Sequence, residues 1–383
     1  MKLKWILYKF LLRLFGLLKI KNNKILFCSY HGNSYSGNPR YIAEALKKKD
    51  ENLDIVWLAS KPLDLPTGMR CVKVKSISAL YEYATSKIWI DDSRKPIWLI
   101  KRGDQFYIQT WHASIGLKKA EGLAVDTLPK EYVDSAKHDS EMADLFLSDS
   151  EWLTKNYREA YWYGGPVLEK GLPREDLLYS PHMPFRNHLI EENDYPKDTR
   201  FVLYAPTFRN SGDLSCYDID FLRLIQTLEN KTGNTWKIII RLHPNIQDKQ
   251  NSIKYDSDVL NGSKYSDINE LILASDLFIS DYSSCIFDAV IANVPSIIYA
   301  SDIDDFTEHE RGLFFSWDEL PFAITRNNNE LNSAIEEINV HDYLIKASNF
   351  MERCGFIKNE HASADVADYI LNVISGSINC YGK

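Results

Sequence analysis

The sequence predicts an α/β protein with two domains of similar design, each built on a parallel sheet with helices on both faces. Short, almost continuous apolar runs alternate with helical stretches along most of the chain. A gap rich in Pro, Glu and Asp at 183–199 interrupts this alternation once, and the same pattern then begins again. The length of 383 residues also suits two domains of roughly 150 residues each.

The expected strands are the short apolar runs. In the first half they are 25–30, 54–59, 71–75, 87–92, 106–111 and 144–150. In the second half they are 200–206, 236–244, 276–281 and 295–300. These runs predict an N-terminal domain over 25–185 and a C-terminal domain over 195–383, with a cleft between them. Ligands of such sheets bind where the strands end at their carboxyl side.

Composition and charge narrow the class of protein. Hydrophobic residues make up 45% of the chain and charged residues 26%, which suits folded domains and excludes a disordered chain. The net charge is −8, so we expect no nucleic-acid partner, because nucleic-acid binders usually carry a basic excess. Residues 1–24 alone carry +7, which leaves −15 for the rest and indicates a local anionic partner.

The basic segment 1–24 predicts an amphipathic helix that binds a membrane surface. Lys9 and Arg13 interrupt its apolar residues, which excludes a signal peptide and a membrane-spanning helix. We expect Lys and Arg side chains to contact anionic lipid, while Trp5, Leu12 and Phe15 form the apolar face. The alternative is a helix that packs on the body of its own protein.

The six cysteines predict no metal site and no disulfide framework. No C-x-x-C is present, and several cysteines lie within apolar runs such as ILFCSY. They are typical of reduced core thiols in a cytosolic protein.

Three strands of the second half end in residues that suit an anion. The residues are Thr207 and Arg209, then Arg241 and His243, then Asp281, Ser283 and Ser284. A helix follows the two serines, so its first N–H groups and the hydroxyls predict a phosphate site without a glycine-rich loop. Each residue also has an ordinary structural alternative, such as a helix cap, a turn or a salt bridge. No P-loop and no G-x-G-x-x-G is present.

In the first half, His112 follows a strand within FYIQTWHASIGLKK, where a neutral imidazole suits a general base. The run SDIDDF at 301–306 is interpreted as an acidic loop, with a divalent-metal site as the alternative. Arg311 follows it as a further anion-binding candidate. The residues call for no cofactor, and a metal is possible but unsupported.

Taken in order, QTWH-x(4)-LKK, YAPTFR, R-x-HP, SDYSS-x-x-FD and D-x-x-D-F…RG-x-x-F resemble the CDP-glycerol glycerophosphotransferase family of teichoic-acid and capsule synthesis. The loop at 32–42 and GLPREDLL at 171–178 also resemble that family. The resemblance implies two Rossmann-like domains facing a cleft, the glycosyltransferase-B type of fold. It also implies peripheral attachment to the cytoplasmic face of the cell membrane.

The resemblance further implies transfer of a polyol phosphate, most simply glycerol phosphate, from a CDP-activated donor to a hydroxyl of a lipid-linked saccharide or polymer, with release of CMP. His112 would be the base and His243 would act on the diphosphate. The residues that would bind the donor are Thr207, Arg209, Arg241, Asp281, Ser283, Ser284 and Arg311.

Two motifs depart from the family. WHASIGLK replaces the usual WHGTP-L-K, and ELPFAIT stands where a proline-glycine-proline element is usual. Both departures concern the acceptor and the polyol. A sugar-nucleotide glycosyltransferase of the same fold, acting on a membrane-linked acceptor, is the alternative function. A sugar-nucleotide epimerase and a catalytically silent envelope-assembly module are the remaining alternatives.

Overall fold

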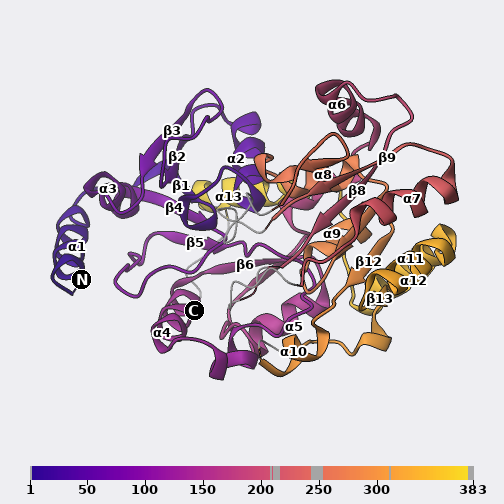
Figure 1. Cartoon of the computed structure of the whole chain (residues 1–383). Coiled ribbons are helices and arrows are strands. Elements are labelled where there is room, and N and C mark those ends of the chain that lie inside the picture. Colours follow the sequence, from indigo (N-terminus) through magenta and orange to yellow (C-terminus); the bar gives the residue numbers. More distant parts are fainter. Residues whose placement is uncertain (1, 208, 210–215, 243–252, 310–311, 378–383) are drawn as a thin grey trace. The chain divides into compact units, whose positions relative to one another are not determined.

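The computed structural model describes residues 2–207, 209, 216–242, 253–309 and 312–377 (Figure 1). The chain forms two compact units. Unit 1 contains Met1–His112, Glu121–Asp176 and Ile357–Lys383, and unit 2 contains Ala113–Ala120 and Leu177–Phe356. This division differs from the predicted ranges 25–185 and 195–383, because each unit includes a segment from beyond its expected range.

The described part of unit 1 contains a seven-stranded parallel sheet in the order β3-β2-β1-β4-β5-β6-β7. The strands are β1 (Lys21–Cys28), β2 (Asp54–Ala59), β3 (Met69–Lys73), β4 (Ser86–Asp91), β5 (Phe106–Gln109), β6 (Leu145–Ser148) and β7 (Val167–Glu169). The helices are α1 (Lys2–Phe15), α2 (Gly37–Lys49), α3 (Ile77–Thr85), α4 (Lys130–Met142), α5 (Glu151–Glu159) and α13 (Ala362–Ser375). Because β1 lies between β2 and β4, the strand order reverses at the β1/β4 pair.

The described part of unit 2 contains a six-stranded parallel sheet in the order β10-β9-β8-β11-β12-β13. The strands are β8 (Arg200–Ala205), β9 (Trp236–Ile240), β10 (Val259–Asn261), β11 (Leu277–Ser280), β12 (Ser296–Tyr299) and β13 (Ala323–Thr325). The helices are α6 (Met183–Asn193), α7 (Phe221–Thr232), α8 (Ile268–Ala274), α9 (Cys285–Ile291), α10 (Ile303–His309), α11 (Asn328–Glu337) and α12 (Val340–Arg353). Here the order reverses at the β8/β11 pair.

The α/β class and the two parallel sheets are confirmed. The central strands read as continuous apolar runs because helices bury both of their faces, as in the buried residues of β8 and β11. The segment 183–199, expected to be a linker, instead begins with helix α6. Its proline lies in the first turn, where no N–H is needed, and Leu189 and Ile190 are buried.

The C-terminal helix α13 belongs to unit 1. It packs against α2, and the Ile357 N–H donates to the Asp149 carbonyl (2.7 Å). Asp176 accepts from the N–H groups of Ala362 (2.8 Å) and Ser363 (3.0 Å), the first residues of α13. The carboxylate therefore caps the helix and fixes it on this unit.

Helix α1 packs on α3 with one side only. Tyr8 and Leu12 are buried, the ring of Trp5 stacks on Trp98, and that of Phe15 meets Tyr81 edge-on. The prediction that Trp5, Leu12 and Phe15 form the outward apolar face is therefore wrong, because these side chains contact the protein itself. No helix in the described residues combines the length and apolar character needed to cross a membrane.

Candidate active site

In unit 2, Asp281 joins the two strand ends at the point where the strand order reverses. It follows β11, and its Oδ1 accepts from the backbone N–H of Thr207, which follows β8 (2.8 Å). The same oxygen accepts from the Tyr282 N–H (2.7 Å). The buried Thr207 hydroxyl has no hydrogen-bond partner among the described residues. These predicted site residues therefore lie side by side at one edge of the sheet.

Arg209 is held by carboxylates on two sides. Its Nε and Nη2 bind Asp302 (2.6 and 3.0 Å), and Nη2 lies 2.9 Å from Asp281 Oδ2. The guanidinium also lies over the ring of Tyr282, which stacks on Phe306. Burial opposes the charge, but the two carboxylates outweigh it and raise the pKa of Arg209. Within the described residues, Arg209 therefore organises the site.

Asp302 belongs to the run SDIDDF at 301–306, for which the sequence left an acidic loop and a metal site as alternatives. Besides Arg209, it accepts from the Tyr282 hydroxyl (3.0 Å). The run was expected to be an acidic loop, but its last four residues, 303–306, lie in helix α10, and only Ser301 and Asp302 precede the helix. No cluster of metal-binding side chains occurs in the part of the chain that the structure describes.

The two serines precede helix α9. Ser284 is its N-cap and makes no side-chain capping bond, while Ser283 Oγ accepts weakly from the Cys285 N–H (3.5 Å) and from its thiol (2.9 Å). Both serines are partly exposed. Their hydroxyls thus lie at the β11 end, and their role in binding a phosphate stays a prediction.

The remaining predicted residues of unit 2 divide into two groups. Arg241 follows β9, and its guanidinium donates to the backbone carbonyls of Gly262 (3.3 Å), Tyr265 and Ser266 (3.4 Å). His243 and Arg311 lie outside the described residues, so their assigned roles stay predictions.

In unit 1, Asp92 occupies the position that corresponds to Asp281. It follows β4, and its Oδ1 accepts from the backbone N–H of Tyr30, which follows β1 (2.8 Å). Ser29 Oγ donates to Oδ2 (2.6 Å), and Ser93 Oγ donates to Oδ1 (2.7 Å). Asp92 is completely buried. A carboxylate thus joins the strand ends at the β1/β4 reversal as well.

His112 follows β5, beside this pair. Its Nδ1 lies 3.1 Å from the Asp92 carbonyl oxygen. A carbonyl only accepts, so Nδ1 carries the hydrogen and Nε2 keeps its lone pair in the neutral ring. The geometry therefore fits a base that acts through Nε2.

Asn38 and Gln109 fix the backbone just before His112. Asn38 Nδ2 donates to the carbonyls of Thr110 (3.2 Å) and Trp111 (3.0 Å), and Gln109 Oε1 accepts from the Trp111 N–H (3.0 Å). Trp111 has a φ of 52°, a left-handed conformation that costs about 1–3 kcal/mol for such a residue. The buried amides offset this strain.

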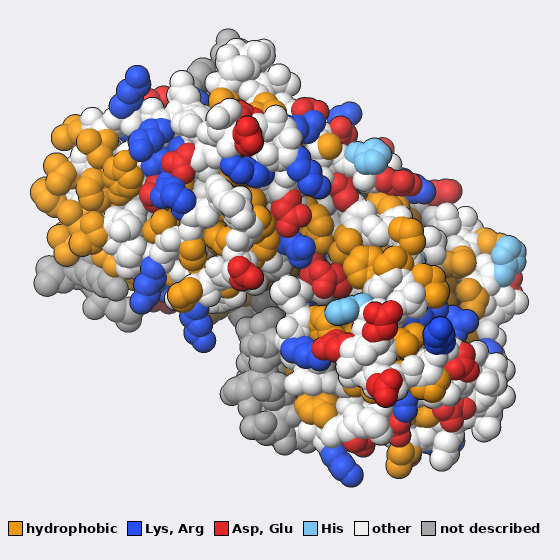
Figure 2. Space-filling view, turned by 90° about the horizontal axis from the view of Figure 1, so that it is seen from above, with side chains coloured by type: hydrophobic (Ala, Val, Ile, Leu, Met, Phe, Trp, Pro, Cys, Tyr) orange, Lys and Arg blue, Asp and Glu red, His pale blue; other side chains and the backbone are white. Residues whose placement is uncertain are grey.

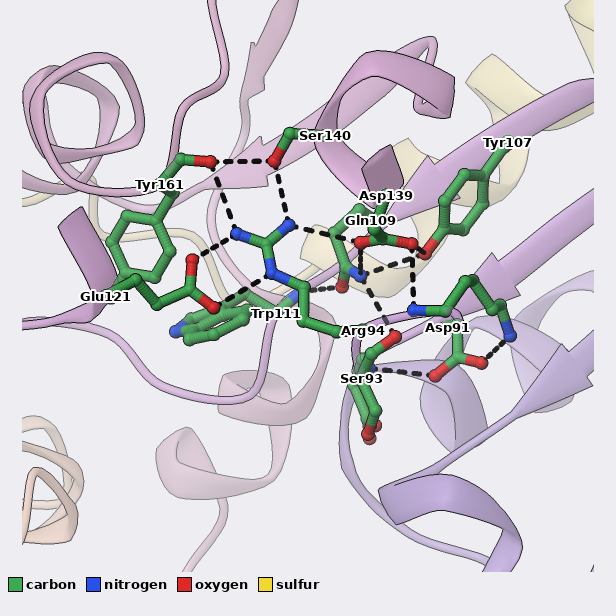
Figure 3. A network of polar contacts seen from close by, with 12 residues as sticks. Asp91, Ser93, Arg94, Tyr107, Gln109, Trp111, Glu121, Asp139, Ser140 and Tyr161 are labelled. Atoms are coloured by element: carbon green, nitrogen blue, oxygen red, sulfur yellow. Dashed lines mark hydrogen bonds and ion pairs between the residues drawn. The ribbon is translucent and has the colours of Figure 1, made fainter. Parts of the chain in front are cut away.

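A buried network of polar contacts around Arg94 also supports the backbone just before His112 (Figure 3). The guanidinium binds both oxygens of Glu121, one at 2.9 Å, and Asp139 Oδ2 at 3.1 Å. It also lies over the Trp111 ring. Gln109 Nε2 donates to Asp139 Oδ2 as well (3.1 Å), so the network reaches the Trp111 backbone.

The segment after His112 belongs to unit 2. The Lys119 N–H donates to the Gly312 carbonyl (2.8 Å), and the Phe314 N–H donates to the Leu117 carbonyl (2.8 Å). Ile115 is completely buried. The residues of WHASIGLK from Ala113 onward are thus part of the packed structure of unit 2, and this segment pairs with the one that follows Arg311.

The profile of one protein family matches residues 7–372. Its description is CDP-Glycerol:Poly(glycerophosphate) glycerophosphotransferase. The chain belongs to this family. Its members are transferases, so the predicted resemblance and enzyme class are confirmed.

Similar proteins are teichoic-acid polymerases of this family. A poly(glycerol phosphate) polymerase from Bacillus spizizenii is 26% identical over 378 residues, which are 95% of this chain and 96% of the relative. One from Bacillus subtilis is 26% identical over 376 residues, 95% of this chain but 50% of the relative. A poly(ribitol-phosphate) polymerase from Bacillus spizizenii is 30% identical over 348 residues, 88% of this chain and 54% of the relative. The chain therefore spans about half the length of two of these relatives.

Solved structures agree with the family. The wall teichoic acid polymerase TagF superposes with a TM-score of 0.84 at 26% identity, covering 97% of this chain and 95% of that one. The MnaA–UDP complex from S. aureus has a TM-score of 0.57 at 12% identity over 94% and 97% of the two chains, which shows a shared fold alone.

Three residues of this candidate site were not among the predicted site residues. They are Ser29, Asn38 and Asp92. Asp92 ends the run KIWIDD, so the rule of strand ends would have selected it. Asn38 carried no such signal, because its partners lie more than 70 residues away.

Arg94→Met tests the buried network. We expect a loss of about 3–5 kcal/mol in the free energy of unfolding, because Glu121 and Asp139 lose their buried cation. Arg158→Met on the exposed side of α5 is the matched control, with a change within about 0.5 kcal/mol. Denaturant unfolding of both variants measures the difference, and equal stability of the two would contradict the role given to Arg94.

Proposed function

We propose that this chain transfers glycerol phosphate from CDP-glycerol to a hydroxyl group of a teichoic-acid-type acceptor and releases CMP. The family profile over 7–372 and the names of the relatives support this activity. The observation that carries it is the bonding of His112, whose Nε2 is left as a base at a strand end. Lipid-linked saccharides and growing polymers are both candidate acceptors.

In the proposed mechanism, unit 2 binds the donor. Thr207, Ser283 and Ser284 offer hydroxyl groups, and the ion pairs of Arg209 keep the β8 and β11 ends in register. Arg241, His243 and Arg311 belong to the same proposed site on the ground of their motifs. Phosphoryl transfer depends mostly on positioning and on charge stabilisation, which such donors supply.

On the acceptor side, His112 Nε2 takes the proton of the attacking hydroxyl. The oxygen forms a bond to the phosphorus that carries glycerol, the bond from that phosphorus to the CMP oxygen breaks, and its electron pair leaves with CMP. The chemistry needs no redox step. Because the neutral ring of His112 already carries its hydrogen on Nδ1, Nε2 can accept this proton without a change of tautomer.

Ribitol phosphate transfer is the second candidate. The relative with the highest identity quoted above, 30%, is a poly(ribitol-phosphate) polymerase. A sugar-nucleotide glycosyltransferase is the remaining alternative, and its product would contain no phosphorus in the new linkage. CDP-glycerol and CDP-ribitol, each offered with a panel of lipid-linked acceptors, separate these activities by CMP release and product mass.

His112→Ala tests the base. We expect CMP release to fall by about 10²–10⁴-fold, the usual contribution of a general base, while donor binding stays within about twofold. His188→Ala, an exposed histidine on α6, is the control and should match the wild type. Wild-type turnover by the His112 variant would exclude the proposed base.

The proposal places the enzyme on the cytoplasmic face of the cell membrane. The outward side of α1 exposes Ile6, Leu7, Phe10 and Leu14, and Leu17 and Leu18 follow. Figure 2 shows hydrophobic side chains gathered over this end of the molecule.

The apolar surface continues beyond α1. Trp98 stacks on Trp5, and Arg102 donates to the Leu18 carbonyl (2.7 Å), so the segment 97–102 lies against the helix. Ile97 and Ile100 on this segment are about half exposed. Together with the exposed basic residues Lys9, Arg13, Lys19 and Lys21, this surface suits the interface of an anionic bilayer, whereas Lys24 is buried against Glu82.

A triple variant tests the membrane surface. Leu7→Ser, Phe10→Ser and Leu14→Ser together should lower binding to anionic phospholipid vesicles by at least about tenfold, because each side chain loses apolar area that lipid would cover. Leu222→Ser, at an exposed site on α7, should leave binding unchanged. Co-sedimentation measures both, and undiminished binding by the triple variant would contradict the proposal.

A further inference from the structure

The carboxylate of Asp92 is buried without a cationic side chain beside it. Its three donors, Ser29, Tyr30 and Ser93, are all neutral. Among the described residues, Asp92 forms no ion pair with Lys or Arg, and Lys95 pairs instead with Asp91. Because a buried carboxylate needs compensation for its lost hydration, a charge partner is expected nearby.

His112 is placed to be that partner. The Nδ1 of its ring is hydrogen-bonded to the backbone carbonyl of Asp92 (3.1 Å). Burial raises the pKa of Asp92, whereas the charge of a protonated His112 and the bonds from Ser29 and Ser93 act in the opposite direction. The two groups are therefore electrostatically linked as well as hydrogen-bonded through the backbone.

The other titratable groups near this pair do not replace His112. His31 lies on the loop after β1, and the causes that lower its pKa are burial, Lys95 and a protonated His112, which outweigh Asp92. Lys75 is also near His31, and Cys28 is buried close to Lys95 and Asp92. Because Lys95 already balances Asp91, the imidazole of His112 is the group left to balance Asp92.

We infer that Asp92 is the positioning residue of the base. Its carbonyl selects the His112 tautomer with a lone pair on Nε2, and its carboxylate stabilises the imidazolium that forms on proton transfer. This inference rests on the proposed function, in which His112 takes the proton of the acceptor hydroxyl. The proton that reaches Nε2 leaves to solvent after CMP departs.

The arrangement divides two tasks that one carboxylate often performs together. In a Ser-His-Asp triad the carboxylate itself orients the imidazole. Here orientation comes from a backbone carbonyl, which no side-chain substitution removes, and only the charge comes from the side chain. Asp92→Asn therefore separates the two tasks, since it keeps the carbonyl and the size of the side chain.

The variant Asp92→Asn tests the charge. We expect kcat to fall about tenfold to a hundredfold, with little change in the KM for CDP-glycerol, because only the transition state gains an imidazolium. A purely structural role would instead lower the free energy of unfolding and leave the kcat of the folded enzyme unchanged.

Asp54→Asn is the matched control. Asp54 is the first residue of β2, so it lies at the amino ends of the strands, whereas Asp92 follows the carboxyl end of β4. Asp54 pairs with Arg70 at 2.8 Å. The kcat and KM of Asp54→Asn should equal those of the wild type. An unchanged kcat for Asp92→Asn would overturn the inference if His112→Ala is inactive, whereas an active His112→Ala would instead overturn the proposed function.

A measurement on the wild-type protein covers the case in which Asp92→Asn does not fold. In ¹⁵N-histidine-labelled enzyme, with the His112 signal assigned from its absence in His112→Gln, the neutral ring should carry its proton on Nδ1. A proton on Nε2 would overturn the inference, because the lone pair would then face the Asp92 carbonyl.

Discussion

In each unit, one carboxylate at the reversal of strand order fixes the backbone next to the candidate site residues. In unit 1 it is Asp92, which accepts the N–H of Tyr30, and in unit 2 it is Asp281, which accepts the N–H of Thr207. A parallel sheet leaves unpaired backbone groups where its neighbouring strands diverge, and a buried carboxylate satisfies them. These bonds fix the loops that carry the candidate site residues.

Each unit adds a buried arginine to this arrangement. Arg94 is paired with Glu121 and Asp139, and Arg209 with Asp281 and Asp302. Both guanidinium groups also lie over aromatic rings. Buried ion pairs of this kind contribute little net stability compared with apolar packing, but removal of one partner is strongly destabilising. Their main effect here is to hold loop backbones in single conformations.

The sequence predicted the sheets because the physics of a buried parallel strand is local. The last four residues of β1 and the five residues of β8 after Arg200 form continuous apolar runs, and this pattern is visible without any partner. The three-residue strands β7, β10 and β13 were not predicted, because a short edge strand is defined by its neighbour. For α1, the helical period was correct but apolar residues occur on both sides, so the sequence did not indicate that Leu12 faces inward and Phe10 outward.

The candidate site was predictable to a similar extent. The rule of strand ends selected His112, Thr207 and Asp281, and the structure places each at the end of a strand. The bidentate contact of Arg209 with Asp302 spans 93 residues, so no spacing in the sequence indicated it. The same holds for Asn38 and its contact with the backbone of Trp111.

The chain passes from one compact unit to the other between His112 and Ala113, and this passage has a mechanical consequence. Lys119 and Leu117 are tied to Gly312 and Phe314 by main-chain bonds, which substitutions of side chains do not remove. Only a few residues separate this tie from the imidazole. Any shift of the segment 312–314 is therefore passed along the main chain toward His112, the last residue of unit 1 before the chain enters unit 2.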